Sequence, residues 1–451
     1  TGADAAAWGR DWTGAYVAEP LCVVRPGSTA EVAAVVRACA AAGVAVVPAG
    51  GRTGLVGGLM NRGAVMVSLE RMAQIREVRP GARLVVAEAG VVLSRLHEAA
   101  EAHGLLFPLW FGARGSATLG GALSTNAGGS NVLRHGSTRG LCLGIEVVLA
   151  DGRVLDLMGQ LHKDNSGYDL RDLFIGAEGT LGIITAAVMR LVPAPLVQVT
   201  ALLALDRLED ALTVLNRLQA ETGGGVEAFE YMPAAYLARL ARLRPDLAGP
   251  LAPIPPLAIL VEVGSTRPED AAPTPEGPVL AVQVERVLAD LAEAGLIRDA
   301  VLARSAAQRA ALWARREAAA EITFAGPGPI LDTDVAVPLD AVPAFVAAIG
   351  PAVAAVDPGA ETLAIAHLGD GNLHFTVYPT RTDAGLKDVL LQAIEGVVAD
   401  LGGSFSAEHG VGLSKLASMR RRKDPVAIEV MRAVKAALDP AGTLNPGKVI
   451  P

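Results

Sequence analysis

Three of the seven histidines of this chain fall in two short motifs, and one of these motifs also carries an acidic residue. His367 and His374 lie in AHLGDGNLHF, and Glu408 directly precedes His409 in SAEHGVG. If each motif is a strand that runs into a glycine turn, two imidazoles and a carboxylate can face one point and bind a divalent metal, with one position left open for a substrate. The spacing of the two histidines is weak evidence by itself, because paired histidines in loops are more often hydrogen-bonded structural residues.

Two glycine-rich segments could bind an anionic ligand. The first follows a short strand predicted at 44–48, and its five glycines between 50 and 58 would allow successive backbone N–H groups to converge on a pyrophosphate. It lacks the GxGxxG pattern and the GK[ST] ending, so it matches neither a Rossmann site nor a Walker loop. The second segment, 108–140, adds hydroxyl and amide donors among its glycines. A ligand-free turn explains one such loop, but two favour a long cofactor that is held at both ends.

The elements that position these residues are those of an α+β fold. Ser28 and Glu31 form a capping box that predicts a helix over 28–42. After residue 197 strands alternate with longer helices, which predicts an antiparallel sheet covered by helices on one face. We expect a first domain over 1–195, a second over 196–422, and a C-terminal helix and tail over 423–451 that pack back on the first.

Composition and charge exclude several classes of protein. With 51% hydrophobic residues and 19% charged residues, the chain is typical of folded proteins. Its net charge of −8 and scattered basic residues argue against nucleic acid as a partner. The longest apolar stretch, 341–356, contains two prolines and a glycine, so we expect a buried helix and a turn and no membrane span. The first residues lack the apolar core of a secretory signal, which predicts a cytoplasmic location.

The two glycine segments, together with KDNSGYDLRDLFIGAEGTLGI at 163–183, resemble the FAD-binding domain of the vanillyl-alcohol oxidase and p-cresol methylhydroxylase family. The resemblance covers nearly the whole chain, and HLGDGNLH and KDNSGYDL are similar to the D-lactate and D-2-hydroxyglutarate dehydrogenases within that family. It implies a two-subdomain FAD-binding domain of the p-cresol methylhydroxylase type, an α+β substrate (cap) domain with an antiparallel sheet, and a C-terminal segment that returns to the flavin. It also implies an oxidoreductase that passes a hydride from a small D-2-hydroxy acid to flavin N5.

Carried over residue by residue, the resemblance places FAD along both glycine segments, a turn near 180 and the C-terminal end. The implied cofactor-binding residues are Pro48, Ala49, Gly50, Gly51, Arg52, Thr53, Gly54, Leu55, Pro108, Gly112, Ala113, Ser116, Thr118, Gly120, Gly121, Asn126, Gly128, Gly129, Glu178, Gly182, Ile183 and Asn445. Family members that attach FAD covalently carry a histidine in the first loop, where this chain has Arg52 and Thr53. Non-covalent FAD is therefore expected.

The resemblance further implies a divalent metal, often zinc, on His367, His374 and Glu408. Such an ion would bind the substrate through its carboxylate and hydroxyl and lower the hydroxyl pKa. His409 is predicted to be the base that takes the hydroxyl proton, and a fourth metal ligand or a core residue is the alternative. Arg316 is predicted to bind the substrate carboxylate, and a solvated arginine on a helix face is the alternative.

Three positions beside the expected substrate depart from the D-2-hydroxyglutarate pattern, which has threonine, lysine and asparagine where this chain has Ala320, Asp332 and Thr376. Asp332 would repel a second carboxylate, so a D-lactate-like substrate is favoured, with D-2-hydroxyglutarate or D-malate as the alternative. A zinc-dependent hydrolase and a non-enzymatic flavin or metal scaffold are the other possible functions. Quinone, a cytochrome or an electron-transfer flavoprotein is the expected electron acceptor, and a homodimer is a possible assembly.

Overall fold

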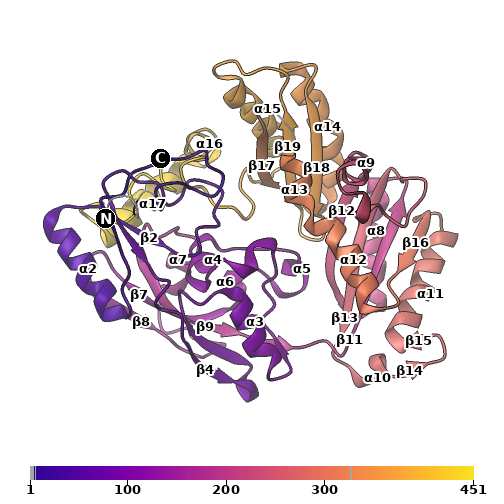
Figure 1. The fold of residues 1–451 in the computed structure, drawn as a ribbon, viewed down its shortest axis with the longest axis horizontal. Coiled ribbons are helices and arrows are strands. Elements are labelled where there is room, and N and C mark those ends of the chain that lie inside the picture. Colours follow the sequence, from indigo (N-terminus) through magenta and orange to yellow (C-terminus); the bar gives the residue numbers. More distant parts are fainter. Residues whose placement is uncertain (1–4, 6, 326–327) are drawn as a thin grey trace. The chain divides into compact units, whose positions relative to one another are not determined.

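The computed structural model describes residues 5, 7–325 and 328–451, and the contacts of the chain divide it into two compact units (Figure 1). The first unit comprises Thr1–Gly129, His135–Ala194 and Glu408–Pro451, and the second comprises Ser130–Arg134 and Pro195–Ala407. This grouping differs from the predicted division for two segments. Residues 130–134 have their contacts in the second unit, and residues 408–422 have theirs in the first.

The first unit contains a parallel sheet of three strands and an antiparallel sheet of five. Their strand orders are β1-β3-β2 and β4-β5-β9-β7-β8, and a short pair joins β6 and β10. The strands are β1 (Cys22–Val24), β2 (Val46–Ala49), β3 (Val65–Ser68), β4 (Ile75–Arg79), β5 (Leu84–Glu88), β6 (Leu105–Leu106), β7 (Cys142–Val148), β8 (Val154–Leu157), β9 (Ile183–Arg190) and β10 (Val192–Pro193). The helices are α2 (Thr29–Ala42), α3 (Leu93–Glu101), α4 (Leu119–Thr125), α6 (Thr138–Leu141), α7 (Arg171–Phe174), α16 (Leu416–Arg422) and α17 (Pro425–Leu438), while α5 (Val132–His135) begins in the segment that contacts the second unit.

The predicted capping box at the start of α2 is confirmed for the N-cap Ser28, whereas the Glu31 carboxylate binds the N–H of the residue before the N-cap. Ser28 Oγ accepts a hydrogen bond from the Glu31 N–H, and Glu31 Oε2 accepts one from the Gly27 N–H. Gly43 ends the helix in the left-handed conformation, with φ of 65°. Local sequence therefore sets both ends of this helix.

The second unit is built on one antiparallel sheet of seven strands, in the order β16-β11-β13-β12-β18-β19-β17. Its strands are β11 (Val197–Leu205), β12 (Val226–Pro233), β13 (Leu257–Ser265), β16 (Asp299–Leu302), β17 (Leu331–Ala336), β18 (Glu361–His367) and β19 (Asn372–Tyr378), with a small hairpin of β14 (Pro273–Thr274) and β15 (Gly277–Pro278). Its helices are α8 (Ala211–Glu221), α9 (Ala234–Leu243), α10 (Pro268–Ala271), α11 (Val279–Glu293), α12 (Ala306–Glu317), α13 (Ala319–Phe324), α14 (Val342–Val356) and α15 (Leu386–Asp400).

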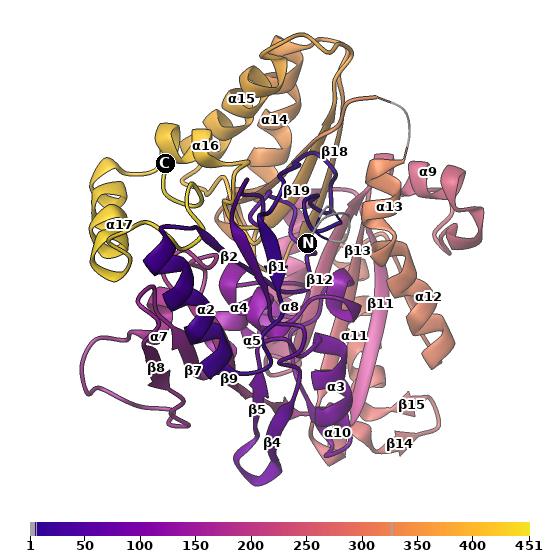
Figure 2. The same cartoon turned by 60° about the vertical axis from the view of Figure 1, so that its left-hand side comes forward.

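Helices cover this sheet on both faces, so the prediction of helices on one face was wrong. The larger apolar core lies between one face and α8, α11, α14 and α15. On the other face α9, α12 and α13 pack over a smaller cluster that includes Leu202, Leu260 and Ile365 (Figure 2). All nine residues of β13 are buried, as expected for a strand with cover on both sides.

The predicted buried helix and turn at 341–356 is one continuous helix, α14, with Pro351 inside it. Val342, Phe345, Ile349 and Val353 are its buried residues, and the Phe345 ring packs edge-on against Phe375 with 6.0 Å between centroids. Among the described residues, the stretch 339–356 is also the one long and apolar enough, by length and composition, to cross a membrane. Core helices of soluble proteins often have the same properties.

The C-terminal segment packs within the first unit. The Val46 N–H donates to Thr443 O, and the Asn445 N–H donates to Val46 O, which adds a bridge beside β2. Behind this bridge Lys435 Nζ donates to Thr180 O and Leu444 O and pairs with the buried Asp439.

The first glycine segment packs directly against the second. A Cβ at Gly51 would stand 2.0 Å from the Ser116 carbonyl oxygen, whereas a Cβ at Gly54 would meet nothing within 4 Å. We therefore expect Gly51→Ala to push the two loops apart and to lower the free energy of unfolding by about 1–3 kcal/mol. Urea unfolding followed by circular dichroism measures this, with Gly54→Ala as the matched control. Equal stability of the two variants would contradict the packing described.

Asp439 is expected to stabilise the C-terminal segment only while it is ionised. Burial alone would raise its pKa, but Lys435 and the N–H groups of Leu444 and Thr443 outweigh burial and lower the pKa below the ordinary 3.8. Since the folded pKa is depressed, this stabilisation is present above the unfolded pKa and is lost as pH falls through the folded pKa.

We predict that Asp439→Asn is less stable than the unmodified protein by about 1–3 kcal/mol at pH 7, and that the difference narrows as pH falls below about 4. Urea unfolding of both proteins at pH 7 and pH 3 tests the prediction. A stability difference of the same size at both pH values would show that the charge of Asp439 does not cause the loss of stability.

Candidate active site

One face of the seven-stranded sheet carries histidines and acids from adjacent strands. His374 on β19 is paired with Asp334 on β17, and His367 on β18 is paired with Glu230 on β12. Directly opposed residues point to the same face, and β18 and β19 are in register, so all four side chains share one face. The two imidazoles are 5.3 Å apart between centroids and nearly perpendicular.

Glu230 is the centre of a buried group of charges. Its side chain is 1% exposed, His367 Nδ1 lies 2.9 Å from Oε1, and Arg316 Nε lies 2.8 Å from Oε2. Burial alone would raise the pKa of this carboxyl, but the electrostatic interactions with His367 and Arg316 and the hydrogen bonds from His367 and Ser130 lower the pKa to about 2. The carboxylate is therefore ionised at neutral pH.

Arg316 has donor capacity that the protein does not use. The residue is 8% exposed, yet Nε and Nη2 have no hydrogen-bond partner, because the ion pair with Glu230 is close but not aligned as a hydrogen bond. The neighbouring Arg315 donates from both of its terminal nitrogens, to the carbonyl oxygens of Ala248 and Ala311, although its Nε also has no partner. An unpaired, buried guanidinium nitrogen is typical of a site that binds an anionic ligand.

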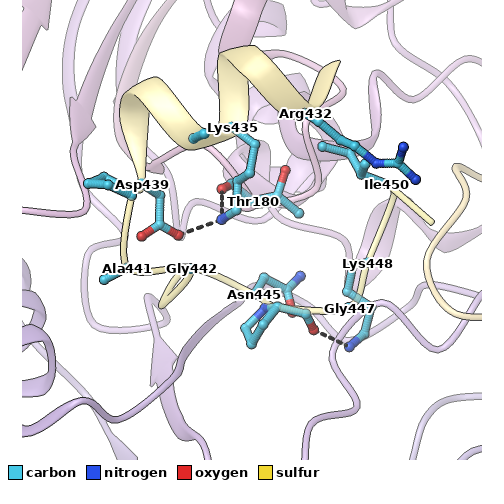
Figure 3. A pocket seen from close by; sticks show the side chains of 13 residues that line it. Thr180, Arg432, Lys435, Asp439, Ala441, Gly442, Asn445, Gly447, Lys448 and Ile450 are labelled. Carbon is cyan, nitrogen blue, oxygen red and sulfur yellow. Dashed lines mark hydrogen bonds and ion pairs between the residues drawn. The ribbon is translucent and has the colours of Figure 1, made fainter. Parts of the chain in front are cut away.

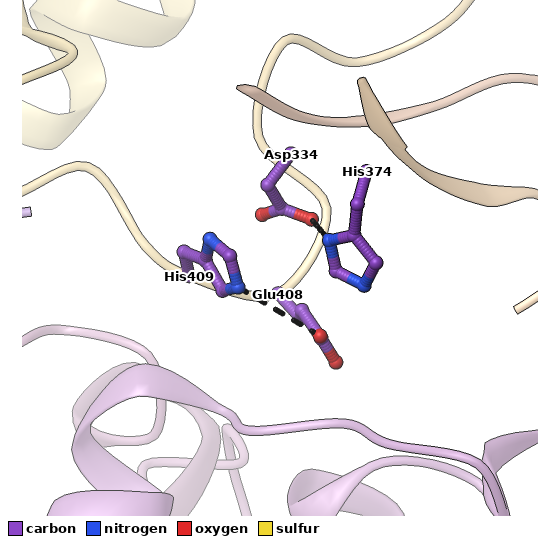
Figure 4. Close-up of side chains that lie close together, drawn as sticks. All are labelled: Asp334, His374, Glu408 and His409. Atoms are coloured by element: carbon purple, nitrogen blue, oxygen red, sulfur yellow. Dashed lines mark ion pairs between the residues drawn. The ribbon is translucent and has the colours of Figure 1, made fainter. Parts of the chain in front are cut away.

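Asp334 fixes the chain that leads into Glu408. It accepts hydrogen bonds from Asn372 Nδ2 at 2.8 Å and from the Ala407 N–H at 3.2 Å, and Glu408 is the next residue along the chain. Asp334 Oδ1 lies 4.0 Å from His374 Nδ1, and Glu408 Oε1 lies 3.9 Å from His409 Nε2 (Figure 4). Each of these four side chains offers one ligand atom, and the four atoms lie within 4.8 Å of one another.

Two imidazoles and two carboxylates are a donor set that suits a zinc-like divalent ion. This group contains three residues singled out from the sequence, His374, Glu408 and His409, and adds Asp334, which sequence reasoning did not assign to the site. His367 is not in the group, although its ring contacts that of His374. The alternation in DTDV could have pointed to Asp334, because it places two acids on one face of a strand.

The three departures beside the expected substrate lie at different places in the second unit. Thr376 is two residues from His374 on the same face of β19, and its Oγ1 donates to Asp332 Oδ1 at 2.7 Å. Ala320 lies on the exposed side of α13. Arg239 is a cation close to this strand. It stacks on the Tyr378 ring and donates to the carbonyl oxygens of Ile322 and Ala325.

The predicted cofactor-binding residues all lie in the first unit, whereas Arg316, His367 and His374 lie in the second. Residues 48–55 begin at the end of β2, and 108–121 run into the first turn of α4, whose N-cap Thr118 accepts from the Gly121 N–H. Gly54, Gly112 and Gly115 have open space where a Cβ would stand, so their backbone is accessible to a ligand. Asn126 ends α4 in the left-handed conformation, with φ of 51°.

Asn445, in the C-terminal segment, joins these segments. Its Nδ2 donates to Gly58 O and Glu178 O, while its buried Oδ1 has no hydrogen-bond partner. Asn445 also lines a pocket of about 400 Å³ with Thr180, Arg432 and Lys448 (Figure 3). An unsatisfied buried acceptor fits a region that a polar ligand completes.

Glu178 contacts protein with its carboxylate. It accepts from the Val411 N–H at 2.6 Å and from the Gly412 N–H at 2.9 Å, two and three residues after His409. Its pKa is raised, because the effect of burial exceeds that of these two N–H groups and of Lys415 and Lys448. The Glu178 side chain, which the resemblance assigned to the cofactor, thus holds the turn that follows His409.

Comparison with known protein families matches both halves of the chain. A family described as FAD binding domain matches residues 20–158, and one described as FAD linked oxidases, C-terminal domain, matches residues 194–449. The structure is also similar to solved flavoproteins. The p-cresol methylhydroxylase structure with substrate bound has a TM-score of 0.70 at 16% identity over 94% of this chain and 88% of its own. Alkyldihydroxyacetonephosphate synthase has a TM-score of 0.67 at 17% identity over 95% and 77%. The predicted two-domain fold of the p-cresol methylhydroxylase type is therefore confirmed.

Sequence relatives extend over nearly the full chain. D-2-hydroxyglutarate dehydrogenase of Xanthomonas citri pv. viticola is 37% identical over 99% of this chain and 93% of its own length. The mitochondrial D-2-hydroxyglutarate dehydrogenase of Bos taurus is 38% identical over 98% and 79%. The chain therefore belongs to the FAD-linked oxidase family that includes these two proteins.

Proposed function

We propose that this protein is an FAD-dependent D-2-hydroxyacid dehydrogenase, which oxidises a small D-2-hydroxy acid to the 2-oxo acid. The observation that carries the proposal is the buried Arg316, whose Nη2 has no partner and whose Nε lies 2.8 Å from Glu230. Glu230 shares one sheet face with His367 and His374. A fixed cation beside imidazoles suits a substrate that has a carboxylate next to a hydroxyl. The relatives named D-2-hydroxyglutarate dehydrogenase support the same reaction class. A zinc hydrolase would leave the match to an FAD-binding family unexplained.

FAD would be held without a covalent bond by the two glycine segments, the turn at 178–183 and Asn445. When bound, it supplies the acceptor for the hydride that leaves the substrate Cα. The chain provides accessible backbone at Gly54 and Gly112 and the unsatisfied Asn445 Oδ1. Arg52 and Thr53 in the first loop offer no histidine for attachment.

A divalent metal, with zinc as the favoured ion, would be held by His374 and Glu408 together with His367 or Asp334. When bound, it polarises the substrate hydroxyl and makes that proton easier to remove. Arg316 binds the substrate carboxylate and sets its orientation. His409 takes the hydroxyl proton, and the turn after it is held by the contacts of Glu178 with Val411 and Gly412.

A D-lactate-like monocarboxylic acid is the favoured substrate, and D-2-hydroxyglutarate or D-malate is the alternative suggested by the names of the relatives. Asp332 supports the smaller acid, because a carboxylate two residues from Asp334 on the same face repels a second substrate carboxylate. Arg239 does not compensate, since it is engaged with backbone carbonyls and Tyr378.

The electron acceptor is expected to be a quinone, a cytochrome or an electron-transfer flavoprotein. A cytoplasmic location and a homodimer remain predictions.

Anaerobic titration of the purified protein with D-lactate, D-malate and D-2-hydroxyglutarate tests the proposed function. We expect flavin absorbance to bleach fastest with D-lactate, and we expect removal of the metal by a chelator to slow bleaching by at least about tenfold while the flavin stays bound. L-lactate is the matched control substrate. If none of the D-hydroxy acids bleaches the flavin of the metal-loaded protein, the proposed function is wrong.

His409→Ala is expected to slow flavin reduction by about 10²- to 10⁴-fold and to leave the bound flavin and metal content unchanged, because a base that only moves a proton does not bind either group. Stopped-flow absorbance and metal analysis measure the two effects, with the exposed His103→Ala as the control. Unimpaired reduction would remove His409 from the reaction, and loss of the metal would make His409 a ligand.

A further inference from the structure

We propose that Glu230 is a positioning residue, which holds His367 and Arg316 in the orientations that the reaction needs. This inference rests on the proposed function, because it assigns a role to a residue behind the substrate and metal sites. Sequence reasoning did not single out Glu230, and its strand β12 lies far from His367 in sequence. The geometry brings them together, because β12 pairs with β18 at Glu230 and His367.

The surroundings of Glu230 explain why an acid occupies this position. The residue is 0% exposed, and three groups from three separate segments approach its carboxylate: His367 on β18, Arg316 on α12, and Ser130. A carboxylate that is fully removed from water is costly unless it is paired. Glu230 therefore stays buried only together with these partners, and each partner is fixed in turn.

The contact with His367 sets the state of its ring. Because Nδ1 lies 2.9 Å from the Glu230 carboxylate, the proton of the neutral imidazole is held on Nδ1. The lone pair of the ring is then on Nε2, which is the atom that would bind a metal under the proposed function. A carboxylate behind a ligating histidine also raises the basicity of that ligand.

The contact with Arg316 sets the direction of its guanidinium. Nε is held 2.8 Å from Glu230 Oε2, and the adjacent Nη2 is buried and without a hydrogen-bond partner. The ion pair therefore fixes one donor position and leaves Nη2 for an incoming carboxylate. One acid thus orients both a predicted metal ligand and the predicted substrate cation.

Another buried glutamate on this sheet provides a comparison. Glu262 is 4% exposed and is bound by Arg309 at 2.7 Å, by Thr200 at 2.6 Å and by Trp313 at 2.8 Å. None of these partners was predicted to act in the site, and none of their nitrogen or oxygen atoms is among the described buried atoms that lack a partner. Glu262 is a buried acid with a structural role, which makes Glu262→Gln the matched control.

The test uses Glu230→Gln, Glu230→Ala and Glu262→Gln in the full chain, loaded with FAD and zinc. Three quantities are measured: the melting temperature, the zinc dissociation constant in a chelator competition, and kcat and KM for the best hydroxy acid. Glu230→Gln keeps an oxygen for His367 Nδ1–H but loses the charge opposite Arg316. We expect its KM to rise at least about tenfold, while zinc affinity changes less than about threefold.

Glu230→Ala removes both contacts, so we expect the zinc dissociation constant to rise by about 10- to 100-fold as well as KM to rise. Added formate should partly restore KM and zinc affinity in Glu230→Ala. It should not change either quantity in Glu262→Gln. Glu262→Gln should lower the melting temperature and leave KM and zinc affinity within about twofold of the unmodified protein.

The proposal is overturned if the Glu230 variants fold and change KM and zinc affinity no more than Glu262→Gln does. If Glu230→Ala is insoluble, the values of KM and kcat for Glu230→Gln decide the test. A rise in KM supports the proposal, and an unchanged KM overturns it. Failure of the proposed function is recognised separately, because the unmodified protein would then reduce no flavin with any hydroxy acid, while zinc affinity would still report on Glu230 and His367.

Discussion

The second unit depends on the cost of burying charge inside a sheet that is covered on both faces. β13 has no exposed residue, and Glu227, Glu230 and Glu262 are buried on or beside it. Each such acid requires partners, since an unpaired charge in this environment would oppose folding. Glu227 and Glu262 are paired with Arg134 and Arg309 and their neighbours, and these contacts complete a structural network. At Glu230 the network instead ends on a guanidinium with an unused donor.

That difference marks Arg316 as a candidate ligand-binding residue independently of the histidines. A well-packed protein leaves few buried polar atoms without partners, so an unpaired buried donor or acceptor needs an explanation. Arg316 Nη2 in the second unit and Asn445 Oδ1 in the first are both of this kind. Both belong to residues that the family resemblance had assigned to ligands, one to the substrate and one to FAD.

Local sequence predicted those features that depend on neighbours in the chain. The capping box of α2 and the clustering of histidines in two motifs are local patterns. Asp334 and Glu230 escaped prediction, because their proximity to the histidines depends on the pairing of β17 with β19 and of β12 with β18, which no local pattern encodes. Pro351 led to a wrong prediction, because the sequence indicated a turn where the structure has a continuous helix. The carbonyl that it deprives of a donor belongs to Ala347, which is exposed to water, while Phe345 and Ile349 bury the other side of the helix.

Glu178 shows how a residue within a family motif can serve a role other than the one assigned by resemblance. Glu178 lies at the end of a predicted cofactor loop, and its backbone has φ of 51°. Its buried carboxylate binds the backbone N–H groups two and three residues beyond His409. Gly410 has φ of 82°, a conformation that favours glycine, and a Cβ there would stand 2.7 Å from Glu178 Oε1. Asn445 donates to the carbonyl of the same Glu178. The predicted cofactor loop, the C-terminal segment and the turn after the proposed base therefore share one set of hydrogen bonds.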